Sequence, residues 1–350
     1  MTVYNQSVPD QDLFIRAHIN ENHFGFSPMV FENLKLMRMN LYPDPGSLEI
    51  RKKIASFHGV DPDMVAVGNG TDEIILMIAL AFLKPSIKAL LVTSSFPGYL
   101  TSARACRAEH CLVTLNSYKN PVEEIGVFCR EHKSVVFLCN PHNPTGTLMS
   151  EEQISWLIDQ AQHSESLVVI DEAYGEFAGQ DFSSAIAFVR KNKGIIATRT
   201  FSKAYGLAGF RIGYAIGQPE DIAAIRAAQC TLPFCVNRLA QAVAPMALQD
   251  QGFLAHVIKQ TNDAKACFYE YLDSRNIQHV KSYSNSVLIK VKDSVNFSAI
   301  LQKDFGILVR DTSPFGLHDH VRITMCLAQD MKKINSAIDS IINNWDLCHG

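Results

Sequence analysis

Between about residue 47 and residue 216 the chain repeats one pattern, in which a short apolar run is followed by a turn and a helical segment. The runs are continuously apolar rather than alternating, which is typical of strands that helices cover on both faces. The expected strands are 64–67, 89–93, 111–115, 135–139, 167–170, 195–197 and 212–216, with helices at 74–83, 99–107, 122–131 and 151–162. This alternation predicts an α/β fold, a mainly parallel sheet flanked by helices.

The pattern changes after about residue 236. Two long helical segments, 236–249 and 253–275, precede apolar runs at 287–291, 307–309 and 321–325 and a last helix at 331–344. This part of the chain predicts a smaller α+β domain. We therefore expect an N-terminal arm over residues 1–28, a large domain over 29–243 and a small C-terminal domain over 244–350.

Composition excludes several classes of function. The chain has 350 residues, of which 47% are hydrophobic and 19% charged, as in globular proteins. A formal net charge of −3 leaves no basic field for nucleic acid. The polar N-terminus and the lack of any apolar run of about 18 residues predict neither a signal peptide nor a membrane span. Nine scattered cysteines without a C-x-x-C pair are expected to be reduced packing residues of a cytoplasmic protein.

In open α/β sheets ligands bind beyond the carboxyl ends of the strands, and the first unusual strand end is rich in glycine. Gly68-Asn69-Gly70-Thr71-Asp72 turns tightly into a helix whose N-terminus can bind an anion. The segment lacks the G-K-[ST] of a P-loop, so a triphosphate is not expected. By itself it is more typical of a plain turn in which Thr71 or Asp72 caps the helix.

Three further strand ends carry polar groups in apolar surroundings. Two prolines fix the loop after 135–139 and the direction of the Asn143 amide. Asp171 ends an apolar strand, where a carboxylate needs a cation or donors unless it caps a helix, and Tyr174 follows three residues later. Lys203 stands among hydroxyls and aromatics, eight residues before Arg211. Desolvation there would lower its pKa toward that of a reactive amine, although an exposed loop lysine remains an alternative.

Together these groups match the requirements of pyridoxal 5′-phosphate (PLP). A lysine amine can form a Schiff base with the aldehyde. A carboxylate keeps the pyridine nitrogen protonated, so that the ring can accept electrons from a substrate carbanion. A phenol and an amide can hold the ring's phenolate oxygen, and the glycine turn, the hydroxyls and an arginine can bind the phosphate.

The chain resembles the fold-type I PLP aminotransferases, and most closely the histidinol-phosphate aminotransferase group. Ten motifs spread over nearly the whole chain carry this resemblance. They are Asn20-Glu-Asn22, Tyr42-Pro-Asp-Pro45, Gly68-Asn-Gly-Thr-Asp-Glu73, Pro97-Gly-Tyr99, Asn140-Pro-His-Asn-Pro-Thr-Gly146, Asp171-Glu-Ala-Tyr174, Thr200-Phe-Ser-Lys203, Gly209-Phe-Arg-Ile-Gly213, Gly306-Ile-Leu-Val-Arg310 and Val321-Arg-Ile-Thr324.

The resemblance implies a role for each matching residue at the cofactor. Lys203 is the Schiff-base lysine and the base, Asp171 pairs with the pyridine nitrogen, and Tyr99 stacks on the ring. The remaining ring and phosphate contacts come from Tyr174 and Asn143 and from Gly70, Thr71, Asp72, Thr200, Ser202 and Arg211. Asp72 is expected to use its backbone N–H, with its side chain capping the helix. The family also implies a homodimer in which Tyr42 reaches the phosphate group in the partner subunit.

Two arginines and the arm motif are expected to bind the substrate. Arg322 lies between Val321 and Ile323, so it points to the opposite face of its strand and suits a carboxylate. The resemblance implies that Arg310 binds a substrate phosphate or the distal carboxylate of glutamate. A structural ion pair remains the alternative for both arginines. Asn22 and Phe24, from the arm, complete the expected substrate site.

The chain departs from the histidinol-phosphate group at two places and carries one metal-like motif. Phe24 stands where many members have a tyrosine, and Cys326-Leu327 replaces a small Gly-Thr step. A missing hydroxyl is worth on the order of 1–3 kcal/mol, enough to alter preference but not reaction type. His318-Asp319-His320 has no third ligand at a recognisable spacing, so no metal is expected.

The sequence therefore predicts transamination between a phosphorylated or aromatic amino compound and 2-oxoglutarate, with histidinol phosphate as the leading donor. The two departures keep an aromatic or specialised-metabolism aminotransferase open. An amino-acid phosphate decarboxylase of the cobalamin pathway shares the architecture. A non-catalytic ligand sensor of the kind found in transcription regulators is disfavoured, because the chain is acidic and its arm is too short for a DNA-binding segment.

Overall fold

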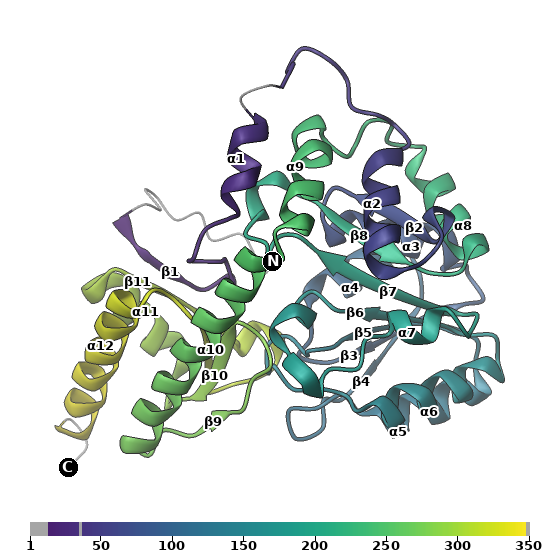
Figure 1. Ribbon diagram of the computed structural model, residues 1–350. Coiled ribbons are helices and arrows are strands. Elements are labelled where there is room, and N and C mark those ends of the chain that lie inside the picture. The colour runs from purple at the N-terminus through teal and green to yellow at the C-terminus, as the bar shows by residue number, and fades with distance from the viewer. Residues whose placement is uncertain (1–12, 35–36, 348–350) are drawn as a thin grey trace.

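The computed structural model describes residues 13–34 and 37–347, and its larger part is built on a seven-stranded sheet (Figure 1). In spatial order the strands are β2 (Val65–Gly68), β8 (Gly213–Ile216), β7 (Ile195–Thr200), β6 (Leu167–Asp171), β5 (Ser134–Cys139), β3 (Lys88–Val92) and β4 (His110–Val113). All neighbours from β7 to β4 run parallel, and only β8 is antiparallel to both of its neighbours. The predicted mainly parallel sheet is confirmed.

Helices cover both faces of this sheet because its strands are apolar on both sides. One buried cluster joins the sheet to α3 (Thr71–Phe82), α4 (Pro97–Ala105) and α8 (Pro219–Gln229). The cluster on the other face takes in α1 (Pro28–Leu34), α2 (Leu48–His58), α5 (Val122–Glu131), α6 (Glu151–Gln162), α7 (Ile186–Val189) and α9 (Arg238–Gln249). Within β5, Val136 and Leu138 enter one cluster while Val135 and Phe137 enter the other.

A second, five-stranded sheet forms the smaller part of the molecule. Its strand order is β1 (Ile15–Ala17), β11 (Ile307–Asp311), β12 (His320–Thr324), β10 (Ser286–Lys290) and β9 (His279–Val280). The helices α10 (Gln251–Ser274), α11 (Ser294–Phe305) and α12 (Ala328–Leu347) lie beside it in Figure 1 and share its apolar core. The α+β prediction for this part is confirmed.

The N-terminal segment, predicted as an arm without a strand, contributes one strand to the small sheet. Ile15–Ala17 pairs in parallel with Ile307–Val309, and Ala17 is fully buried in the core of the small sheet. The residues after this strand contact both domains, because the His18 carbonyl accepts from Arg322 and the Ile19 carbonyl accepts from Lys203. The predictions for residues 1–6 and for Cys348 lie outside the described residues.

The alignment of three strand ends decides where polar groups lie close together. β5, β6 and β7 end side by side, with Cys139 opposite Asp171 and Asp171 opposite Thr198. The loops that follow these strands therefore start at one edge of the sheet.

Over the described ranges every cysteine is a free thiol, although Cys230 and Cys267 are exposed rather than packed. No described helix has the length and apolar character needed to cross a membrane.

Candidate active site

A cavity of about 410 Å³ opens at the carboxyl ends of β5, β6 and β7, where arm and small domain meet the large domain. Predicted residues form most of its wall: Thr71, Asp72, Asn143, Asp171, Tyr174, Thr200, Ser202, Lys203, Arg211 and Arg322. Ile19, Phe96, Cys139 and Ala173 also line it and were not predicted. No group of His, Cys, Asp and Glu in the described part of the chain could hold a metal ion.

Lys203 reaches into this cavity from the loop after β7. Its Nζ donates to the carbonyl oxygen of Ile19 at 3.0 Å and lies 5.8 Å from the centre of the Tyr174 ring. Burial, followed by the charge of Arg322, lowers the pKa of the Lys203 amine to about 8. A considerable fraction of the amine is therefore neutral near physiological pH, as a nucleophile or a base requires.

Asp171, at the end of β6, is only 4% exposed but has a hydrogen-bond donor at each carboxylate oxygen. The Tyr99 hydroxyl donates to Oδ2 at 2.8 Å, and the Thr198 hydroxyl donates to Oδ1 at 3.0 Å. Burial raises the pKa of Asp171 to about 6, against the lowering effect of these two bonds. Thr198 was not predicted, although its position opposite Asp171 in the sheet follows from extending 195–197 by one residue.

The structure corrects the role predicted for Tyr99. This side chain is 2% exposed and stacks on Phe137, with ring centres 5.6 Å apart and an interplanar angle of 17°. It does not line the cavity, whereas Phe96 does, three residues earlier at the start of α4. The aromatic wall of the cavity is thus Phe96, and the Tyr99 ring supports it edge-on from behind at 5.3 Å.

Asn143 and Tyr174 face the same space from neighbouring loops, as predicted. The Asn143 Oδ1 accepts a hydrogen bond from Arg322 Nη1 at 2.5 Å, which directs its amide nitrogen elsewhere. The Tyr174 hydroxyl accepts from the Asn20 side chain at 3.0 Å, and Asn20 is itself held by Thr324. Asn20 belongs to the arm motif but was not predicted as a site residue.

The anion-binding end of the cavity is built around the N-terminus of α3. Gly70 has φ +80°, and a Cβ there would lie 2.6 Å from the Arg211 guanidinium. No side chain caps the helix, so its first N–H groups remain available to an anion. The sequence predicted that the Asp72 side chain caps α3. This prediction is wrong, because the side chain pairs with Arg211 at 2.8 Å instead. Arg211 also contacts the Ser202 hydroxyl at 3.4 Å.

Arg322 lies in the cavity wall and Arg310 directly behind it, opposite in the β11–β12 ladder. The Arg322 Nη2 donates to the His18 carbonyl at 2.7 Å and the Arg310 Nε to the same oxygen at 3.4 Å. Arg310 is 7% exposed and is not among the lining residues. The predicted orientation of Arg322, away from the apolar core that holds Val321 and Ile323, is confirmed.

Three residues discussed in the sequence lie away from the cavity. Asn22 forms a local turn, in which its side chain accepts from the Phe24 N–H at 2.9 Å and donates to the Ala204 carbonyl at 3.0 Å. The Phe24 ring packs against the core of the large domain. Cys326 is fully buried in the small-domain core. None of the three lines the cavity, so neither departure from the family pattern touches it directly.

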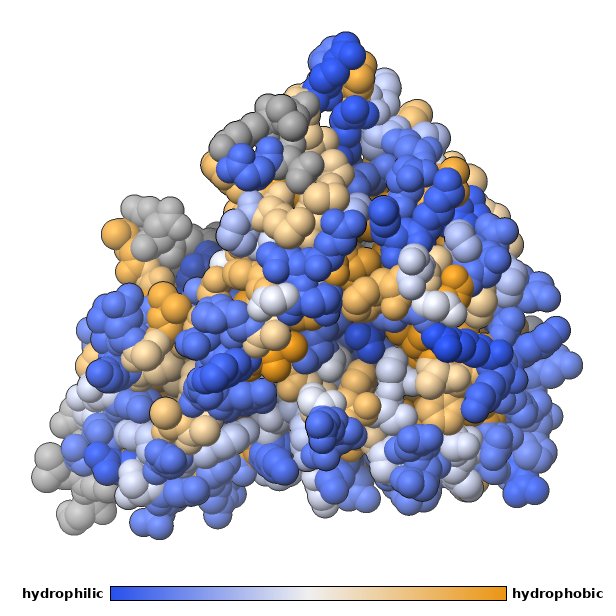
Figure 2. Space-filling model, viewed as in Figure 1, coloured by the Kyte–Doolittle hydropathy of each residue, from blue (hydrophilic) through white to orange (hydrophobic). Residues whose placement is uncertain are grey.

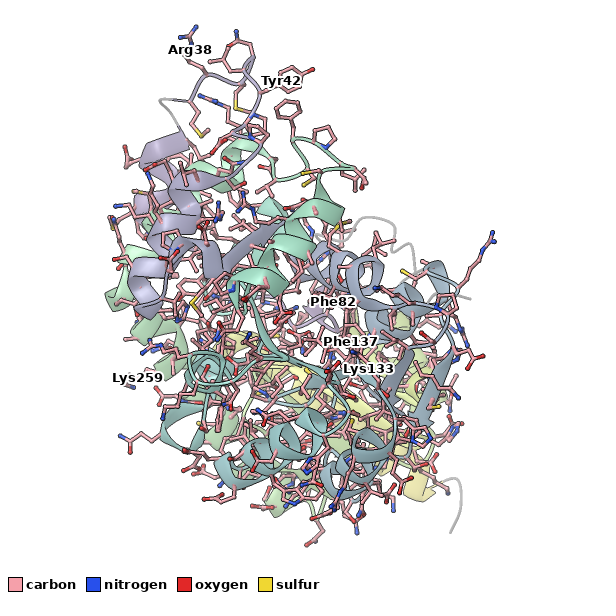
Figure 3. The ribbon with its side chains drawn as sticks, turned by 90° about the vertical axis from the view of Figure 1, so that its right-hand side faces the viewer. Arg38, Tyr42, Phe82, Lys133, Phe137 and Lys259 are labelled. Carbon is pink, nitrogen blue, oxygen red and sulfur yellow. The ribbon has the colours of Figure 1, made fainter. Side chains whose placement is uncertain are left out.

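Tyr42 lies outside the cavity of its own chain. Its side chain is 78% exposed at the end of a projecting loop, as Figure 3 shows, whereas Phe137 lies in the interior. The Tyr42 ring stacks on Phe234 with centres 4.7 Å apart.

The cavity therefore offers the chemistry that PLP needs. Its wall contains a half-buried amine, a buried carboxylate, an amide and a phenol, together with the first residues of α3 and an arginine. The close approach of Arg211 to the Gly70 backbone is possible only without a Cβ.

Comparison with known proteins supports this chemistry. The model of the family "Aminotransferase class I and II" matches residues 18–341. A histidinol-phosphate aminotransferase 2 of Carboxydothermus hydrogenoformans is 34% identical over 313 residues, covering 87% of this chain and 85% of that protein. A histidinol-phosphate aminotransferase of Bacillus cytotoxicus is 34% identical over 336 residues, covering 94% and 89%.

A solved structure shares the whole fold. The histidinol-phosphate aminotransferase of Sinorhizobium meliloti, crystallised with pyridoxal 5′-phosphate, has a TM-score of 0.87 at 24% identity. The likeness covers 98% of this chain and 96% of that one. With the family model matching almost from the arm to the last helix, this chain belongs to the class I and II aminotransferases.

Proposed function

We propose that this enzyme is a PLP-dependent histidinol-phosphate aminotransferase that uses 2-oxoglutarate as amino acceptor. The observation that carries the proposal is the presence, in the wall of one cavity, of the half-buried Lys203, whose pKa is lowered, and of the buried carboxylate of Asp171. The names of the curated relatives support the choice of histidinol phosphate. When bound, PLP supplies an electron-accepting ring that stabilises negative charge on the reacting carbon of the substrate.

Different residues of the cavity wall would bind different parts of the cofactor. Asp171 would hold a proton on the pyridine nitrogen, and Asn143 and Tyr174 would bind the phenolate oxygen. Thr71, Thr200, Ser202 and Arg211, together with the N–H groups of α3, would bind the phosphate. Phe96 would cover one face of the ring.

Lys203 would move the substrate proton. Its amine, with a pKa lowered to about 8, can take a proton from the α-carbon and return it as an ammonium donor. Arg322 and Asn143 hold each other at 2.5 Å, so a carboxylate or phosphate bound by Arg322 would stand beside the residue that contacts the ring. The buried surroundings exclude water and strengthen these contacts.

Arg322 is the substrate anchor that the cavity presents. Its guanidinium suits the bidentate binding of the glutamate α-carboxylate and of a phosphate. Arg310 lies behind the His18 carbonyl, and we infer that it supports Arg322 and the distal anion of the substrate. To bind a substrate phosphate, Arg310 would have to release the His18 carbonyl and donate to the ligand instead.

We also propose a homodimer in which Tyr42 of each chain reaches the phosphate end of the partner's cavity. Large apolar side chains are exposed around this loop, including Phe31 (53%), Met39 (66%) and Leu232 (50%). Figure 2 shows apolar residues at the surface over α1. Light scattering of the purified protein should give twice the mass of the chain, and a monomer would contradict the dimer. A cytoplasmic location stays a prediction.

Turnover of a small panel of amines tests the proposed function. The purified, PLP-loaded enzyme is incubated with 2-oxoglutarate and histidinol phosphate, phenylalanine or tyrosine, and glutamate formation is measured. We expect the highest kcat/KM for histidinol phosphate. A higher value for an aromatic amino acid would favour the aromatic aminotransferase. Release of carbon dioxide from O-phosphothreonine without amino transfer would identify a decarboxylase and contradict the proposal.

A further inference from the structure

Tyr99 has no place in the mechanism described so far, although it touches the residue on which the ring chemistry depends. It is buried behind the cavity wall, and its hydroxyl donates to Asp171 Oδ2 at 2.8 Å. Thr198, fully buried on β7, donates to the other oxygen at 3.0 Å. Both donors come from neutral hydroxyls, so neither can neutralise Asp171 as a cation would.

If Asp171 pairs with the ring nitrogen of PLP, the shared proton can be bound either to that nitrogen or to the carboxyl group. A buried carboxylate with no donors holds a proton tightly, because burial penalises its charged form. Among the described residues no cation bonds to its oxygens, and burial raises the pKa of Asp171 to about 6 even with both hydroxyl bonds present. Each bond donated to the carboxylate stabilises its charge and lowers its proton affinity. The hydroxyls therefore favour a proton on the ring nitrogen over one on Asp171.

We propose that Tyr99, assisted by Thr198, is a positioning residue that keeps the cofactor-ring nitrogen protonated by donating to Asp171. This inference rests on the proposed PLP function. Tyr99 serves a second purpose through its ring, which stacks on Phe137 and meets Phe96 edge-on at 5.3 Å. One side chain thus fixes both the partner of the ring nitrogen and the aromatic wall of the cavity.

The two contributions can be separated by substitution. Tyr99→Phe removes the hydroxyl and keeps the ring contacts, so Phe96 should keep its place. Thr198→Val removes the second donor and keeps the side-chain shape. Tyr271→Phe is the matched control, because its hydroxyl also bonds a carboxylate, Asp339 at 3.0 Å, but far from the cavity in the small domain.

The direct readout is the nitrogen-15 chemical shift of PLP labelled at its ring nitrogen. We expect the wild-type holoenzyme and Tyr271→Phe to give the shift of a protonated pyridine. Tyr99→Phe should move the shift toward that of neutral pyridine, and the double variant Tyr99→Phe/Thr198→Val should move it further. Two controls accompany the spectra, thermal denaturation to show that each variant is folded and PLP titration to show that it is loaded.

Kinetics should follow the same order. Loss of one bond to a charged group predicts a fall in kcat for glutamate of about 10- to 100-fold in Tyr99→Phe, with an unchanged KM. A wild-type nitrogen shift in folded, loaded Tyr99→Phe and in the double variant would overturn the inference. A wild-type enzyme that binds no PLP would instead refute the proposed function, so the two failures are distinguishable.

Discussion

The two halves of the cavity are held in different ways. On the cofactor side, Asp171 and Lys203 stand at the ends of neighbouring strands of one sheet, and side chains such as Thr198 and Tyr99 fix the carboxylate. On the substrate side, Arg322 and Arg310 share the backbone carbonyl of His18 from the arm. The carboxylate of Asp171 is thus fixed within one domain, whereas Lys203 and the two arginines also contact the arm.

The difference has a chemical consequence. Side-chain donors at Asp171 stay in place when ligands bind, because they lie behind the cavity wall. The carbonyls of His18 and Ile19 accept from Arg322 and Lys203, the residues that are proposed to bind the substrate and the cofactor. If the two residues bind ligands as proposed, contacts with the arm must change at Arg322 and at Lys203, whereas the contacts of Asp171 need not change.

The largest expected effect is on the cofactor side, at Lys203. Lys203→Ala should lower kcat by more than about 10⁴-fold, the upper range for one general acid–base group, because both the cofactor bond and the proton carrier are lost. Lys265→Met is the matched control, since burial also lowers the pKa of Lys265 to about 8 and its amine also donates to a backbone carbonyl, that of Ser282. Steady-state transamination measures both, and equal losses would contradict the assignment.

The next effect concerns the stability of the cofactor-free protein. Burial raises the pKa of Asp171 from 3.8 to about 6, so its contribution to the free energy of unfolding is full below pH 4 and is lost as the pH rises through 6. Asp171→Asn should therefore gain up to about 3 kcal/mol relative to the wild type between pH 4 and pH 7. Urea denaturation at several pH values measures the difference.

A carboxylate whose pKa shifts the other way provides the control for this experiment. Arg275 lowers the pKa of Asp339, so its contribution is present at neutral pH and is lost as the pH falls. Asp339→Asn should lose stability relative to the wild type toward neutral pH, the opposite sign. If the difference in the free energy of unfolding between Asp171→Asn and the wild type did not change with pH, ionisation of Asp171 would not destabilise the folded protein, which would contradict the prediction.

On the substrate side, Arg322→Lys should affect binding more than chemistry. The lysine cannot make the paired contacts of a guanidinium, so the KM for glutamate should rise about 10- to 100-fold, the value of one bond to a charged group. Arg275→Lys, at the surface beside Asp339, should leave the kinetics unchanged. An unchanged KM in Arg322→Lys would move the carboxylate site elsewhere.

The smallest effect is expected at the phosphate end. Asp72 and Arg211 form a pair whose side chains are 59% and 43% exposed, and such pairs contribute about 0–1 kcal/mol. Asp72→Asn removes a negative charge from the proposed phosphate site while Arg211 keeps its contacts to Ser202 and Ala208. PLP affinity, measured by fluorescence titration, should tighten by at most about five-fold. A large loss would show that Asp72 positions Arg211.

The sequence predicted the cofactor side well because its signals are local. A strand that ends in a polar residue can be recognised without its neighbours, and parallel strands bring Asn143, Asp171 and Lys203 to one edge. The choice of aromatic residue failed for the same reason. Phe96 and Tyr99 lie on one helical turn, and only the packing of α4 on the sheet decides which of them faces the cavity.

The substrate side could not be predicted to the same depth. β1 has three residues and pairs with a strand about 290 positions later, so no local periodicity marks it. Without that pairing the arm motif suggested Asn22 and Phe24, whereas Ile19 lines the cavity and Asn20 holds Tyr174. The hydrogen bonds of His18 involve its backbone, which the residue type does not reveal.

The position of the covalently bound cofactor tests the central claim most directly. PLP-loaded enzyme is reduced with borohydride, digested and sequenced by mass spectrometry. Lys203 should carry the phosphopyridoxyl group, with Lys265 unmodified. A modified Lys265, any other modified lysine in its place, or a loaded enzyme without a lysine adduct would contradict the assignment of this cavity.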